Sequence, residues 1–317
     1  MESPAQLLNA AEWAAATPDS QVDIVVLAPR RNETRRQLRA TAALLHTPET
    51  RIIWCEARQG VRGPLRIAGR VVPSVRAAGR LVLGDPFSGL MQSVLPFFGG
   101  SSLVVVDDGT ATLEAVDRLE LGEPLLRWHQ VRRGPVQRAR GQTATRLLTS
   151  RPLELFTAMP VDSTRLWVRH NRYDWLRSRW PRPQLRPGAA LIGTSLVETK
   201  VVRPDAYLQA VADLVAGGGL TRYLAHRRED EQKLATISAL GVSVERPLLP
   251  LEIELGRGPV EQRVLSFPST VLYTLPLVLA GAGVDVQALD VEEAWLTDDA
   301  RQHGASDFLQ RVRDHRA

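Results

Sequence analysis

The sequence has a single cysteine and lacks any long apolar run. Cys55 has no second thiol with which to form an internal disulfide and follows an apolar, strand-like run, so we interpret it as a buried structural thiol in a reducing cytoplasm. The longest apolar stretch, 271–284, contains Pro276 and falls short of the roughly 18 residues that a spanning helix needs. The first residues have neither the basic start nor the apolar stretch of a secretion signal. We therefore expect a cytoplasmic protein.

Lysine is also scarce, so the positive charge comes from arginine. Lys200 and Lys233 are the only lysines among 40 Lys and Arg residues, and the net charge is +5. Such a balance is compatible with an acidic glycan, an anionic lipid surface or a nucleic acid as partner, and it selects none of them. The length of 317 residues and the hydrophobic fraction of 44% favour a globular protein of two domains.

Apolar, strand-like runs alternate with helical patterns over most of the chain, which predicts an α/β protein. We expect strands at 22–27, 51–56, 80–83, 102–106, 189–192, 220–225, 241–245, 263–266 and 284–289. We expect helices at 5–16, 33–45, 204–216, 230–239, after Ser88 and after Thr270. Two stretches interrupt the alternation: residues 56–73, which we predict to be hairpin-like, and residues 127–186, which we predict to be irregular.

The second of these stretches is basic and rich in tryptophan, and prolines at 181, 183 and 187 mark its end. We therefore predict an N-terminal Rossmann-like domain at 1–186, which includes this Trp/Arg connector, and a C-terminal Rossmann-like domain at 187–317. The connector is interpreted as a segment whose tryptophans pack between the lobes. A groove for an acidic glycan and a membrane-surface anchor are the alternatives.

Polar residues follow three of the predicted strands, at the edge where open α/β sheets bind ligands. Asp107-Asp108-Gly109 follows the strand at 102–106, and His226 follows the strand at 220–225. Ser269-Thr270 follows the strand at 263–266 and opens a helix. Simpler interpretations are a polar turn, a surface histidine and a plain helix N-cap, respectively.

These elements resemble, in the same order, the motifs of the bacterial sialyltransferase and polysialyltransferase family, which includes lipooligosaccharide sialyltransferases and α-2,8-polysialyltransferases. Asp107-Asp108-Gly109 resembles the acidic-acidic-glycine motif, and His226 resembles the histidine of the histidine-proline motif. Ser269-Thr270 resembles the serine-serine or serine-threonine motif. The sequence departs from the family at Arg227, where the family usually has a proline whose ring would fix the backbone.

The resemblance implies a GT-B-like architecture, in which two Rossmann-like domains face each other across a cleft. It also implies an inverting glycosyltransferase that transfers sialic acid, or polysialic acid units, from CMP-sialic acid to a bacterial surface glycan. Asp108 would take the proton from the attacking hydroxyl, with Asp107 as the second candidate. His226 would assist the departure of the phosphate.

The donor-binding residues follow from the same resemblance. Ser269 and Thr270 would bind the phosphate through their hydroxyls and the start of a helix. Glu252 would contact the ribose, with a solvated strand face as the alternative, and the Gly193-Thr194 turn would let the backbone approach the donor. CMP has a single phosphate and the sequence has no DxD motif or His/Cys cluster, so we expect no metal and no other cofactor.

Two other functions stay open: transfer of another CMP-ulosonate, such as a Kdo or legionaminic-type sugar, and non-catalytic binding of a nucleotide or polyanion. The expected partners are the CMP-sugar donor and an acidic or surface glycan acceptor. Peripheral contact with the inner membrane is an open alternative to a purely cytoplasmic location. No nucleic acid is expected, although an RNA binder would also be basic.

Overall fold

The computed structural model describes residues 1–18, 21–45, 50–58, 63–127, 134–302 and 304–314. The chain divides into two compact units, Met1–Trp175 and Leu176–Ala317. The division falls within helix α8 (Asp174–Arg179), whereas the sequence places the boundary before residue 187.

Unit 1 is built on parallel strands in two sheets, one with the order β1-β2 and one with the order β3-β4-β5-β6. The bounds of these strands are Val22–Leu27, Thr50–Cys55, Arg80–Leu83, Ser102–Val106, Leu153–Thr157 and Trp167–His170. The helices from α1 to α7 span Pro4–Ala15, Asn32–Leu45, Gly63–Arg66, Val72–Ala77, Gly89–Val94, Ala111–Leu121 and Pro135–Thr149. A π-helical turn, Ile67–Val71, joins α3 to α4, and a 3-10 turn, Leu95–Phe97, follows α5.

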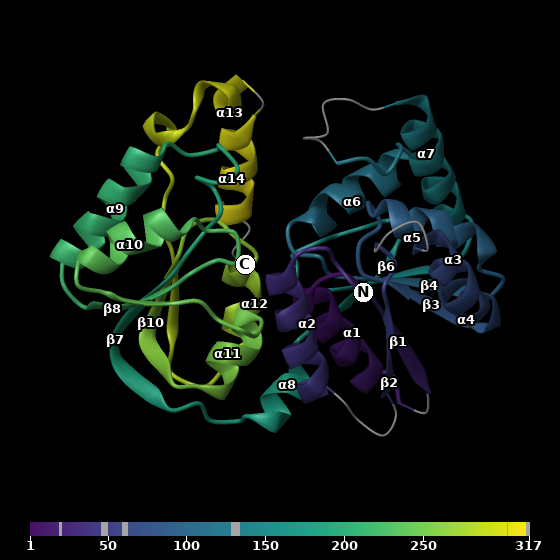
Figure 1. Cartoon of the computed structure of the whole chain (residues 1–317), viewed down its shortest axis with the longest axis horizontal. Helices are drawn as coiled ribbons and strands as arrows, with labels where there is room; N and C mark the ends of the chain where they lie inside the picture. Colours follow the sequence, from purple (N-terminus) through teal and green to yellow (C-terminus); the bar gives the residue numbers. More distant parts are fainter. Residues whose placement is uncertain (19–20, 46–49, 59–62, 128–133, 303, 315–317) are drawn as a thin grey trace. The chain divides into compact units, whose positions relative to one another are not determined.

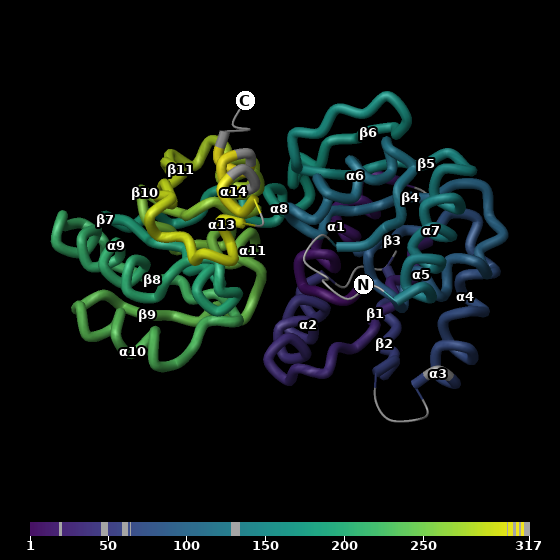
Figure 2. The backbone as a smooth tube through the Cα atoms, turned by 90° about the horizontal axis from the view of Figure 1, so that it is seen from above, coloured from purple at the N-terminus to yellow at the C-terminus, as the bar shows by residue number. Residues whose placement is uncertain are grey.

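Unit 2 contains a five-stranded parallel sheet with the order β11-β10-β7-β8-β9, which Figure 2 shows as neighbouring tubes. The strands from β7 to β11 span Leu185–Ile192, Leu220–Leu224, Ser243–Glu245, Val260–Ser266 and Asp285–Ala288. In chain order this is the doubly wound arrangement 3-2-1-4-5, whose direction reverses between β7 and β10. The predicted fold class, α/β with Rossmann-like parallel sheets, is confirmed.

Helices cover both faces of the sheet in unit 2: α9 and α10 lie on one side, and α11 and α12 lie on the other (Figure 1). The helices of unit 2 after α8 span Pro204–Ala216, Glu231–Ala239, Leu251–Arg257, Val271–Val278, Asp298–Gln302 and Ala305–Asp314, and a 3-10 turn spans Glu293–Trp295. Between the sheet and α9 the core buries Leu191, Tyr207, Val211 and Phe267, with the rings of Tyr207 and Phe267 centred 5.3 Å apart. This core fixes the carboxyl ends of the strands.

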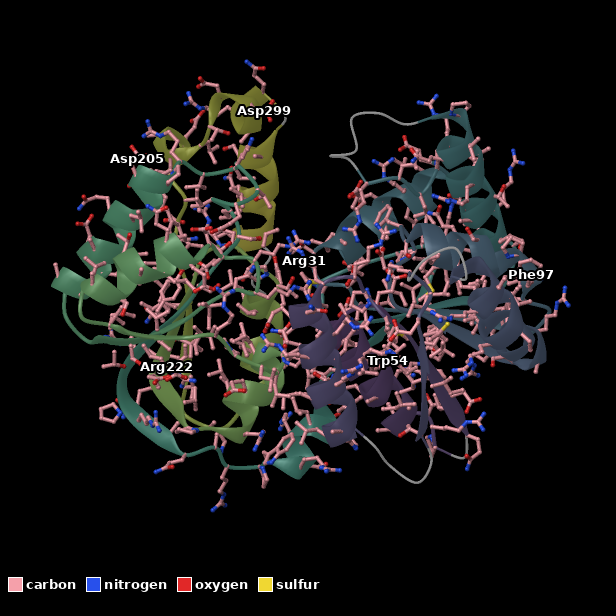
Figure 3. All side chains as sticks on the ribbon, in the orientation of Figure 1. Arg31, Trp54, Phe97, Asp205, Arg222 and Asp299 are labelled. Carbon is pink, nitrogen blue, oxygen red and sulfur yellow. The ribbon has the colours of Figure 1, made fainter. Side chains whose placement is uncertain are left out.

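A buried arginine connects three strands of unit 2 and is labelled in Figure 3. Arg222 on β8 lies 3.1 Å from a carboxylate oxygen of Glu245 on β9 and 3.4 Å from one of Glu261 on β10. Because its charge is matched on both sides within the fold, Arg222 belongs to the structure of the sheet and not to a ligand site.

Two expectations from the sequence are wrong. Residues 56–73 are largely helical in their described part, since α3, the π-helical turn and the start of α4 lie there, with Gly69 inside the π-helical turn. Residues 127–186 are not an irregular connector, because α7, β5, β6 and α8 lie within them. Trp128, Arg132 and Arg133 of that stretch lie outside the described residues. In the described part of the chain, no helix is long and apolar enough to span a membrane.

Candidate functional site

The acidic motif lies where two neighbouring strands of unit 1 end. β3 and β4 are parallel, with Leu83 paired with Val105, so the residues after them meet at one edge of the sheet. Asp85 follows β3, while Asp107 and Asp108 follow β4. The sheet therefore brings three carboxylates to the edge that binds ligands in this class of fold.

Asp107 has a structural role in unit 1. Its side chain is buried, with 1% of the residue exposed. The Thr157 hydroxyl donates to Oδ1 at 2.5 Å, and the Ala158 N–H donates to Oδ2 at 2.5 Å. The Asn9 amide donates to the Asp107 carbonyl at 3.1 Å. These bonds tie the end of β4 to the end of β5 and occupy both carboxylate oxygens.

Replacement of Asp107 with alanine should therefore reduce stability, because it leaves the Thr157 and Ala158 donors without this acceptor. We expect a loss of about 1–3 kcal/mol in the free energy of unfolding, measured by urea denaturation. Asp117 on α6 is exposed, so Asp117→Ala serves as the control. Equal unfolding midpoints for the two variants would contradict the structural role of Asp107.

Asp108 has a different environment, because its side chain reaches the surface with 19% of its area exposed. Gln6 donates from Nε2 to Oδ1 at 2.8 Å, and Arg127 donates from Nη2 to Oδ2 at 3.3 Å. The pKa of Asp108 is raised to about 7, mainly by burial and then by the negative charge of Asp85, while the hydrogen bond from Gln6 and the charge of Arg127 act against the rise. A carboxylate with this pKa is suited to accept a proton at neutral pH.

Three residues that the sequence did not single out surround Asp108. Arg127 bridges the two strand ends, since the same Nη2 lies 2.8 Å from Asp85. Gln6 is held in orientation because its Oε1 accepts the Glu2 N–H at 2.7 Å. Asp85 follows a strand in the same way as Asp108, so comparison of the strand ends could have found it. Gln6 and Arg127 carry no such signal.

The other motifs meet at the carboxyl edge of unit 2. β10, β7 and β8 are neighbouring parallel strands. Ser269 follows β10, Gly193 and Thr194 follow β7, and His226 follows β8. The reversal of strand order lies between β10 and β7, and ligands bind at this position in doubly wound sheets.

His226 is a neutral hydrogen-bond donor in the free protein. Its Nδ1 accepts the Arg228 N–H at 3.2 Å, so the proton of the neutral ring is on Nε2. The pKa of His226 is lowered to about 3, mainly by burial and then by the positive charges of Arg227, Arg228, Lys233 and Arg246. In the free protein the ring is therefore neutral, and it can donate a hydrogen bond to a phosphate group from Nε2–H.

Ser269 and Thr270 precede α12, but neither is a plain side-chain cap. The Thr270 side chain makes no capping hydrogen bond, and Ser269 Oγ lies 3.0 Å from Ser266 Oγ. Both residues are partly exposed. Their hydroxyls and the first N–H groups of α12 lie at the same strand end, an arrangement that favours an anion.

The structure gives a reason for glycine at position 193 within the fold, and the approach of the donor to this turn stays a prediction. A Cβ on Gly193 would lie 2.2 Å from Glu229 Oε2 and 2.9 Å from Tyr223 Oη, so the fold itself requires glycine here. The Gly193 N–H donates to the Leu224 carbonyl at 2.8 Å. The Thr194 carbonyl accepts from Lys233 Nζ at 3.1 Å. The turn after β7 is therefore held from within unit 2.

Glu252 lies on helix α11, so the alternative of a solvated strand face is wrong. The residue is buried, and the Thr274 hydroxyl on α12 donates to its Oε1 at 2.7 Å. Burial raises the pKa of Glu252. The observed contact joins α11 to α12, and the ribose contact stays a prediction. Within the described ranges, no group of three or more His, Cys, Asp or Glu residues could hold a metal ion.

No protein-family model and no curated protein matches the sequence. Among solved structures, a similar chain is that of Phytolacca americana UGT2 complexed with UDP-2fluoro-glucose and pterostilbene. The identity is 11%, the match covers 99% of this chain and 94% of that chain, and the TM-score is 0.48.

Proposed function

We propose that this chain is an inverting glycosyltransferase of the sialyltransferase kind, which uses CMP-sialic acid and works without a metal ion. The observation that supports this most is Asp108, a partly exposed carboxylate at a strand end whose pKa is raised to about 7. A group that takes a proton from a sugar hydroxyl needs this protonation behaviour.

In the proposed reaction, the acceptor hydroxyl attacks the anomeric carbon of the donor sugar. A carbon–oxygen bond forms to the acceptor, and the bond from the anomeric carbon to the CMP phosphate breaks, with its electron pair leaving on the phosphate. Asp108 takes the hydroxyl proton. Attack opposite to the leaving group inverts the anomeric centre.

In the proposal, residues at the carboxyl edge of the sheet in unit 2 bind the leaving phosphate. The Nε2–H of His226 donates to a phosphate oxygen, and the added negative charge raises the pKa of the histidine. Ser269 and Thr270 add hydroxyl donors, and the N-terminus of α12 adds a favourable dipole. Two more elements belong to the proposed donor site: Glu252 contacts the ribose, and the Gly193-Thr194 turn lets the backbone approach the donor.

The acceptor in this proposal is an acidic or surface glycan. The positive net charge of the chain is compatible with an anionic acceptor and with peripheral contact with the inner membrane. Transfer of another CMP-ulosonate would use the same residues, because the proposal assigns none of them to the side chain of the sugar.

A thermal-shift titration with CMP, UMP, UDP and GDP in the presence of EDTA tests the donor. We expect CMP to raise the midpoint by about 5–10 °C at a hundredfold excess over its Kd, because only the folded state binds it. Ser269→Ala should reduce this shift, whereas Ser238→Ala, an exposed serine on α10, should retain it. A response to UDP or GDP alone would contradict the CMP donor, and no response to any nucleotide would favour a non-catalytic protein.

A further inference from the structure

A buried ion pair lies beneath the carboxyl edge of unit 2. Glu229 Oε1 lies 2.8 Å from Lys233 Nζ. Glu229 precedes α10, and Lys233 lies in its first turn. Their side chains are 0% and 7% exposed. Removal of two charges from water is costly unless their geometry and hydrogen bonds are good, so a stability role alone explains such a pair poorly.

Glu229 fixes the backbone around His226. Its Oε2 accepts the His226 N–H at 2.6 Å, and its own N–H donates to the His226 carbonyl at 3.0 Å. Arg246 donates to the carbonyls of both residues, at 3.3 Å and 3.0 Å. The imidazole then accepts the Arg228 N–H on Nδ1. The orientation of the imidazole thus depends on this turn.

Lys233 fixes the neighbouring strand end. Its Nζ donates to the Thr194 carbonyl at 3.1 Å and lies 3.4 Å from Glu198 Oε1. The ammonium also lies 4.1 Å from the centre of the Tyr207 ring. The ion pair therefore joins the turn after β7 to the turn after β8.

The remaining contacts of Glu229 are also internal. The Tyr223 hydroxyl donates to Oε1 at 2.5 Å, and the Tyr207 hydroxyl lies 2.7 Å from that of Tyr223. Gly193 leaves the space that Oε2 occupies. Because the side chain is fully buried and its oxygens have partners within unit 2, Glu229 acts through His226 and Thr194 and not on a substrate.

We infer that the Glu229–Lys233 ion pair is a positioning device that holds Nε2 of His226 and the Thr194 turn toward one bound ligand. It supplies the local rigidity that a proline after the histidine would give, in a chain that has Arg227 at that position. The inference rests on the proposed function, because the ligand in question is the CMP moiety of the donor.

Kinetics of four variants test this inference: Glu229→Ala, Glu229→Gln, Lys233→Met and the control Glu293→Gln, an exposed glutamate of the 3-10 turn. The assay is CMP release from CMP-sialic acid, with rates divided by the folded fraction from circular dichroism. We expect kcat to fall by up to about 100-fold for Glu229→Ala, because a small displacement of a reacting group has effects of this size. Glu229→Gln retains an acceptor for the His226 N–H, so its kcat should fall less.

A second readout requires no substrate. In ¹⁵N NMR spectra of the imidazoles, wild-type His226 should show one neutral tautomer with the proton on Nε2, and Glu229→Ala should show a mixture of both. Lys233→Met should raise the pKa of His226 from about 3, because one of the cations that lower it is removed. This rise in the pKa of His226 is limited, because three other cations remain, namely Arg227, Arg228 and Arg246.

The kinetics and the NMR spectra together distinguish failure of the proposed function from failure of the positioning role. A folded Glu229→Ala variant with wild-type kcat and a single Nε2–H tautomer would overturn the positioning role. Absence of CMP-sugar turnover in the wild type would overturn the proposed function, while the NMR spectra would still support or contradict the positioning of His226. Loss of stability without any change in tautomer would assign the ion pair to folding alone and would also overturn the inference.

Discussion

Replacement of Asp108 with asparagine is expected to lower kcat for transfer by about 10²–10⁴-fold, because the variant loses the base that takes the hydroxyl proton. CMP binding should be retained, since the proposed phosphate donors lie in unit 2. The asparagine keeps the shape of the side chain and an oxygen for the Gln6 amide, which donates to Asp108 at 2.8 Å. The measurement is a comparison of kcat and CMP affinity in both proteins.

The control for this change is Asp117→Asn, on the exposed face of α6. Both variants replace a carboxyl group with an amide of the same shape, so a difference in rate between them reports the position of the carboxyl group. Wild-type turnover in Asp108→Asn would remove Asp108 from the mechanism and leave the raised pKa without a catalytic role.

The pH profile follows from the same residue. Because the base must be ionised, kcat/KM should rise with pH through about 7 and level off above it, given a pKa of about 7 for Asp108. Asp85→Asn removes a negative charge that raises this pKa, so it should shift the rise to lower pH. Arg127→Met removes a positive charge that lowers the pKa, so it should shift the rise to higher pH.

Replacement of His226 with alanine is the second change with a large expected effect. Loss of one preorganised donor to a charge that develops in the transition state costs about 10²–10³-fold in kcat. The effect should appear in kcat more than in donor KM, because the leaving phosphate carries the new charge only as the bond breaks. Steady-state kinetics with CMP-sialic acid measures both constants.

A histidine at a strand end in unit 1 provides the control. His170 ends β6 and is exposed, so His170→Ala should retain wild-type kcat. Since the pKa of His226 is lowered to about 3, its titration in the free protein should add no limb to the pH profile near 6.5. Equal rates for the two alanine variants would show that His226 takes no part in the reaction.

Elements with strong apolar runs and clear helix ends could be predicted from the sequence. The helix at 204–216 begins with Pro204 and is followed by Gly217, and its observed bounds are the predicted ones. The strand at 102–106 was also predicted with its observed bounds, because all of its residues after Ser102 are apolar and buried. The motifs at the ends of such strands were therefore placed at the correct edges.

Strand β6 could not be predicted in this way. β6 is a short edge strand whose first residue, Trp167, is 64% exposed, so the alternation that identifies a half-buried strand is missing. Neighbours of the site that come from distant segments were missed for a different reason. Gln6 is 102 residues from Asp108 in sequence, and a short-range pattern cannot connect them.

The Glu229 carboxylate occupies the space that a side chain at position 193 would need, and this limits how the sequence can change over evolution. A methyl group at position 193 would lie 2.2 Å from the Glu229 carboxylate and 2.9 Å from Tyr223 Oη, so alanine there requires a shorter residue at position 229 and a small shift of Tyr223. A shorter residue at 229 leaves the buried Lys233 ammonium without its closest anionic partner. Substitutions at these three positions are therefore epistatic, and the order in which they occur decides which of them are tolerated.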